Sequence, residues 1–99
     1  MFGKRKQIQE LSPPPIATEN SSAIELLRVW AAPGSPQQLS LRAIWKDPGA
    51  WGLLLADIAN HAAKAYAKDG FSEEEVRAQI RSMFDAEWAS PSNVPEDIS

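Results

Sequence analysis

The stretch Asp47–Gly70, DPGAWGLLLADIANHAAKAYAKDG, predicts the helix on which the rest of the chain must pack. Asp47 is a good N-cap, because its carboxylate can accept hydrogen bonds from the free N–H groups of a first helical turn. Pro48 follows at the position where a missing N–H costs nothing, and Gly70 supplies the left-handed residue that ends many helices. Apolar residues recur between these ends at steps of three and four and predict one buried stripe, made of Trp51, Leu54, Leu55, Ile58, Ala62, Ala65 and Tyr66.

A second helix is predicted from about residue 73 to about residue 88. Ser72 and Glu75 form the S-x-x-E pattern of a capping box. The consecutive glutamates 73–75 place negative charge at the positive end of the helix dipole. Pro91 ends the helix, since the residue before a proline is disfavoured in helical backbone. The apolar stripe of this helix is Val76, Ile80, Met83, Phe84 and Trp88.

The segment before the long helix has the period of β-strands. Apolar residues alternate along residues 27–31 and again along 39–43, and the turn-forming residues 32–37 separate the two runs. This pattern predicts an antiparallel hairpin with a loop of about six residues, which places Arg28 opposite Arg42 and Trp30 opposite Ser40. One face should lie on the helices and carries Leu27, Val29, Ala31, Leu39, Leu41 and Ala43.

The predicted fold class is α+β, with the order β-β-α-α in a single domain of residues 25–89. A flexible N-terminal arm, residues 1–24, and a flexible C-terminal tail, residues 90–99, flank it, and the Pro13–Pro15 run in the arm favours extended polyproline II. A domain this short buries only about 60% of its unfolded surface. A two-stranded hairpin is also marginal alone and has two open edges. We therefore expect a homodimer in which the hairpin of a second chain completes the sheet.

Composition excludes several classes of function. The chain has no cysteine, which excludes disulfides and thiolate metal sites, and its single histidine argues against an all-protein metal site. The formal net charge of −3 argues against a nucleic-acid partner, which needs clustered basic residues. No apolar run approaches the roughly 18 residues of a membrane span. We expect a cytoplasmic protein with no cofactor, no metal and no membrane or nucleic-acid partner.

Arg28, Trp30 and Arg42 form the first candidate site, on the hairpin face turned away from the predicted core. Like charges directly opposite each other are unfavourable, so an acidic neighbour is expected beside the arginines, such as Glu25, Glu87 or the C-terminal tail of a dimer partner. Two interpretations remain open. The tryptophan and arginines form a platform for an anionic partner or base, or they form a dimer contact or a surface held by acidic residues of the same chain.

An alternative pocket is predicted on the long helix, near Trp51, Asp57, His61 and Tyr66. His61 is the only side chain that titrates near neutral pH, and Asp57, four residues earlier, can pair with it. No nucleophile elbow, glycine-rich phosphate loop or second histidine accompanies them, so no catalytic residue is predicted. The sequence predicts a self-associating interaction or accessory protein, with a small-molecule-binding module or minor enzyme as the alternative.

Three segments carry a resemblance to a known family: LRVWAAPG at 27–34, WKDPGAWG at 45–52 and MFDAEW at 83–88. The chain resembles, over about residues 25–90, a family of small bacterial proteins known only as a domain of unknown function. The resemblance implies a self-standing domain. It implies no activity, cofactor or catalytic residue.

Overall fold

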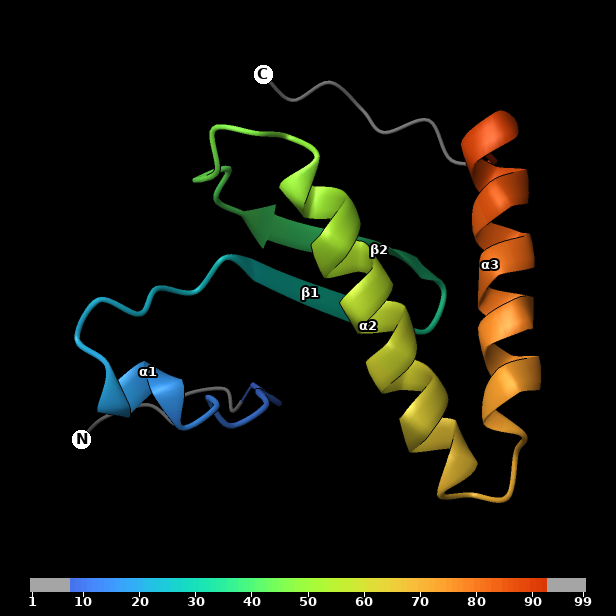
Figure 1. Ribbon diagram of the computed structural model, residues 1–99, viewed down its shortest axis with the longest axis horizontal. Helices are drawn as coiled ribbons and strands as arrows, with labels where there is room; N and C mark the ends of the chain where they lie inside the picture. The colour runs from blue at the N-terminus through green and yellow to red at the C-terminus, as the bar shows by residue number, and fades with distance from the viewer. Residues whose placement is uncertain (1–7, 93–99) are drawn as a thin grey trace, which may run out of the picture. The chain divides into compact units, whose positions relative to one another are not determined.

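The computed structural model describes residues 8–92, in which two strands and two long helices follow a short first helix (Figure 1). The chain divides into two units, unit 1 ending at Ile44 and unit 2 beginning at Trp45. An antiparallel hairpin followed by helices confirms the predicted α+β arrangement. The arm and tail predicted at the two ends lie partly outside the described residues.

The hairpin of unit 1 pairs β1 (Leu27–Ala32) with β2 (Ser35–Leu41). The predicted loop and pairing were wrong: Arg28 lies opposite Ser40, and the chain reverses within Pro33 and Gly34. Gly34 has a φ of 78°, a left-handed value that makes this tight turn possible. The register moves by two residues, so each side chain keeps its predicted face.

A β-bulge interrupts β2 near the turn. Trp30 pairs with Gln38 and Ala32 with Ser35, so one residue of β1 faces two residues of β2, which are Pro36 and Gln37. Proline has no N–H to donate to a ladder, and a bulge is one of the few places where a strand accepts it. The pairs Leu27–Leu41 and Val29–Leu39 lie beyond the bulge and confirm that the apolar residues share one face.

The described part of the N-terminal arm contains α1 (Ile16–Glu19), a single helical turn. The prediction of extended polyproline structure is wrong at its end, because Pro15 takes helical angles and starts this turn. Its fixed φ suits the start of a helix, where no N–H is needed. The backbone N–H groups of Thr18 and Glu19 donate to the Pro15 carbonyl at 3.1 and 3.0 Å.

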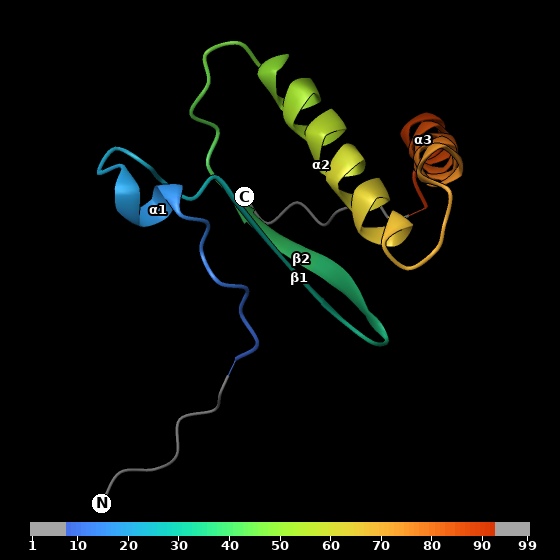
Figure 2. The same cartoon turned by 60° about the horizontal axis from the view of Figure 1, so that its bottom comes forward.

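Unit 2 consists of α2 (Ala50–Ala67) and α3 (Glu73–Ala89), which lie side by side (Figures 1 and 2). The predicted N-cap at Asp47 was wrong, because α2 begins at Ala50 with Gly49 as its N-cap and no side-chain cap. The Asp47 carboxylate accepts a hydrogen bond from the Gly49 N–H at 2.8 Å, in the turn that precedes α2. Gly70 has the expected positive φ of 95°. The Ser72 hydroxyl accepts from the Glu75 N–H at 3.3 Å, which confirms the N-terminal cap of α3. Within residues 8–92, no helix combines the length and hydrophobicity needed to cross a membrane.

The contact between α2 and α3 is built on small side chains. Ala63 on α2 and Val76 on α3 are the buried residues of the described chain. Alanines let a second helix approach closely, so α3 packs on the Ala63 side of α2. The predicted stripe of α2 is buried only in part: Leu54 and Ala62 are half-buried, whereas Leu55 and Ile58 remain 44% and 43% exposed.

Candidate interaction surface

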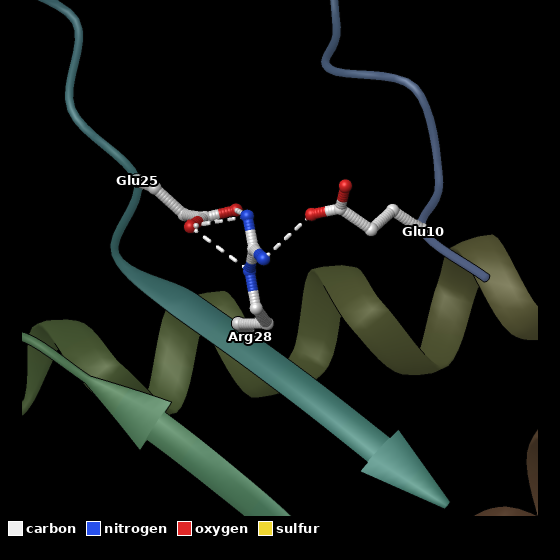
Figure 3. A network of polar contacts seen from close by, with 3 residues as sticks. All are labelled: Glu10, Glu25 and Arg28. Atoms are coloured by element: carbon white, nitrogen blue, oxygen red, sulfur yellow. Dashed lines mark hydrogen bonds and ion pairs between the residues drawn. The ribbon is translucent and has the colours of Figure 1, made fainter. Parts of the chain in front are cut away.

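Arg28 lies at the centre of a three-residue ionic network in unit 1 (Figure 3). Its Nε and Nη2 donate to the Glu25 carboxylate at 3.1 and 3.2 Å, and its Nη1 donates to Glu10 Oε2 at 2.8 Å. These bonds to Glu25, and then those to Glu10, raise the pKa of Arg28 above its ordinary value. Glu25, one of the expected acidic neighbours, is present, and the two carboxylates beside the charged Arg28 make this network unfavourable for an anionic partner.

Trp30 and Arg42 complete the first candidate site only in part. Arg28, Ser40 and Arg42 line a shallow hollow of 310 Å³, with residues 25–27 and Leu41 as its other walls. Trp30 lies opposite Gln38, two pairs further along the strands, and does not line this hollow. The structure therefore brings the two arginines together and leaves the tryptophan beside them.

His61 has a different partner from the one expected. Its Nδ1 lies 3.0 Å from the backbone carbonyl oxygen of Asp57. Because a carbonyl oxygen only accepts, Nδ1 is the donor in this bond. The Asp57 carboxylate takes no part in this bond, so the carboxylate–imidazole pair of a general base is not formed.

Trp51 and Tyr66 do not share a pocket. They are separated by fifteen positions on one straight helix, or about 22 Å along its axis. Each makes its own edge-to-face aromatic pair, Trp51 with Trp45 at 5.4 Å and Tyr66 with Phe71 at 5.5 Å between ring centroids. The residues of the alternative pocket are therefore not assembled into one site.

Sequence reasoning missed a hollow of 280 Å³ in unit 2, lined by Asn60, Lys64, Glu73 and Arg77. The sequence feature that could have indicated this hollow is the four-residue spacing within each helix. This spacing places Asn60 and Lys64 on one face of α2, and Glu73 and Arg77 on one face of α3. The hollow is open to solvent and mixes both signs of charge. Among residues 8–92, no group of three or more histidine, aspartate or glutamate side chains is placed to hold a metal ion.

The apolar face of the hairpin is the main surface that unit 1 leaves open. Val29, Leu39 and Leu41 are 53%, 58% and 52% exposed, and Leu27 beside them is half-buried. Figure 2 shows the hairpin edge-on as a single layer. A single layer cannot bury its own apolar face, so this face is built to be covered.

A search of curated proteins found no match. Among solved structures, the chain is similar to one from Rhodopseudomonas palustrus CGA009, described as that of a "putative pyruvate dehydrogenase", with 34% sequence identity and a TM-score of 0.72. The alignment covers 100% of this chain and 98% of that one. A family model matches residues 10–92, which adds the segment around α1 to the region of the predicted resemblance. The chain belongs to this family, a domain of unknown function, DUF5076.

Proposed function

We propose that this protein is a self-associating interaction module of the cytoplasm, whose working form is a homodimer joined through the hairpin of unit 1. The observation that carries the proposal is the exposed apolar face, centred on Val29 and Leu39, of a sheet that has two strands within residues 8–92. Burying apolar surface contributes about 25 cal/mol per Å², and an isolated two-stranded hairpin is marginally stable at best. A further layer or further strands are needed.

A second copy meets this need in a way that one chain cannot. Helices laid on the apolar face would cover it, but they would leave the backbone groups at both sheet edges without a ladder partner. A second hairpin supplies strands at one edge of each copy and joins the two apolar faces into one broad face, which helices can then cover as a second layer. In a twofold dimer the same patch serves both partners, so one sequence satisfies both sides of the interface.

The test is the molar mass in solution, measured by size exclusion with light scattering over a range of protein concentrations. We expect a dimer for the unaltered chain. Val29→Lys places a charge on the apolar face of β1 and should raise the dissociation constant at least tenfold, or about 1.4 kcal/mol. The control is Gln38→Lys, on the opposite face of β2, which should leave the mass unchanged. A monomer at all concentrations contradicts the proposal and favours coverage of the face by the chain's own helices.

The alternative function, a small-molecule module or minor enzyme, finds no assembled pocket at Trp51, Asp57, His61 and Tyr66. The dehydrogenase name describes the Rhodopseudomonas protein and assigns no role to a residue, so it supplies no activity here. A thermal-shift screen against metabolites addresses this alternative directly, since a ligand that binds the native state raises its melting temperature.

A further inference from the structure

The two edges of the hairpin differ in how well they can accept another strand. Within the described residues, β1 and β2 form a two-stranded sheet, so each has one side without a partner strand. β2 carries a bulge with Pro36 inside it, and bulges and prolines are the devices by which proteins protect an edge from strand addition. β1 has neither, and its six residues, LRVWAA, contain a single charge.

We infer that a second copy of this chain pairs through the β1 edge, antiparallel, with Val29 opposite Val29 of the second copy. This inference rests on the proposed homodimer and specifies its interface. The sheet then has the order β2-β1-β1-β2, and the apolar faces of both hairpins lie on one side.

The ladder within the hairpin identifies which backbone groups are free to pair. The Arg42 N–H donates to the Leu26 carbonyl at 2.8 Å, so this pair is a hydrogen-bonded one. Hydrogen-bonded and non-hydrogen-bonded pairs alternate along an antiparallel ladder. The pairs Leu27–Leu41 and Val29–Leu39 are therefore non-hydrogen-bonded, and their N–H and C=O groups point away from the hairpin. On β1, the groups that face outward before the bulge are those of Leu27 and Val29, and Ala31 follows in the same alternation.

Charge and strand ends then select the register. Shifting one β1 strand along the other by an odd number of residues would bring the apolar face of one copy beside the polar face of the other. Centring the pair on Arg28 would set two arginines opposite each other, which is unfavourable. Centring it on Trp30 would set Leu27 against Pro33, which has no N–H. With Val29 at the centre, Leu27 pairs with Ala31 and every outward group has a partner.

This register gives the first candidate site a role. Arg28 lies opposite Trp30 of the second copy in a non-hydrogen-bonded pair, where side chains approach most closely. An arginine over an indole ring is a favourable cation–π pair. Glu25 and Glu10 hold the guanidinium through hydrogen bonds of 2.8 to 3.2 Å.

Single-cysteine variants test the edge, because the natural chain has no cysteine. Val29→Cys places two thiols at Cα positions about 5.5 Å apart, within the range of a disulfide. Leu39→Cys is the matched control, since Leu39 pairs with Val29 on the same face and its two copies lie three strand spacings apart, about 14 Å. We expect a covalent dimer from Val29→Cys and none from Leu39→Cys on mild oxidation. A covalent dimer from Leu39→Cys and none from Val29→Cys would refute pairing through the β1 edge but not the homodimer. A monomeric mass for both reduced variants would refute the homodimer itself.

A mixture of two single-cysteine variants tests the register of the β1–β1 pairing. It also ensures that the test does not depend on one variant alone. Arg28→Cys and Trp30→Cys should form a covalent heterodimer when mixed, because these positions are directly opposite. Arg28→Cys alone should give little covalent dimer, since its two copies are diagonal neighbours about 7–8 Å apart. Efficient cross-linking of Arg28→Cys to itself would overturn the proposed register.

Discussion

Val76→Ala tests the packing of unit 2, because Val76 is 7% exposed in the contact between α2 and α3. The change removes two buried methyl groups, which contribute about 0.8 kcal/mol each. Alanine recovers roughly 0.5 kcal/mol through its higher helix propensity, and the residual cavity adds to the loss. We expect a net destabilisation of about 1–2 kcal/mol.

The assay is urea unfolding followed by circular dichroism, at one fixed protein concentration because a dimer's stability depends on it. For a domain of this length, each kcal/mol corresponds to a melting-temperature shift of about 4–8 °C. Met83→Ala is the control on the same helix, since Met83 is 69% exposed and its loss should cost less than about 0.5 kcal/mol. A Val76→Ala cost no larger than that of Met83→Ala would refute the packing of α3 on the alanine side of α2.

Three further predictions concern the ends of the helices. Ser72→Ala removes the cap on the Glu75 N–H and should destabilise unit 2 by about 1 kcal/mol in the same urea assay. An unchanged free energy of unfolding would mean that the cap contributes nothing. Gly70→Ala meets no neighbouring atom within 4 Å but must adopt a φ of 95°, so unfolding should become easier by about 1 kcal/mol through backbone strain alone. Hydrogen bonds from Ser92 lower the pKa of Glu87. These bonds therefore stabilise the fold fully above the ordinary glutamate pKa, and this stabilisation is lost as the pH falls through the lowered pKa of Glu87. The Ser92 amide should then exchange faster with solvent in acid, and Glu87→Gln should remove that pH dependence.

Local signals in the sequence predicted the start of α3 at Ser72 and the positive φ at Gly70, and they placed the N-cap of α2 too early, at Asp47 instead of Gly49. Ser72 acts through a group three residues away, so neighbouring residues alone determine its role. Strand faces were predictable for a similar reason, because a period of two assigns each side chain to a face. The register was not, since a shift of two residues leaves every face unchanged and only the tight turn at Gly34 decides between the alternatives.

Packing and ionic contacts depend on parts of the chain that no local pattern connects. The large apolar residues of α2 predicted the buried stripe, whereas close approach of α3 favours the side with Ala63. The contact of Arg28 with Glu25 could be anticipated from their three-residue separation. Its contact with Glu10 could not, because eighteen residues separate the two.

Amide exchange of β1 tests most directly the claim that a second copy completes the sheet. The measurement is hydrogen exchange followed by NMR, at a concentration where the protein is dimeric. The Val29 and Leu27 amides should exchange at least tenfold more slowly than those of Leu39 and Leu41, because only the β1 edge gains hydrogen-bond partners. Equal, rapid exchange at all four amides, or protection of Leu39 and Leu41 instead, would contradict the account.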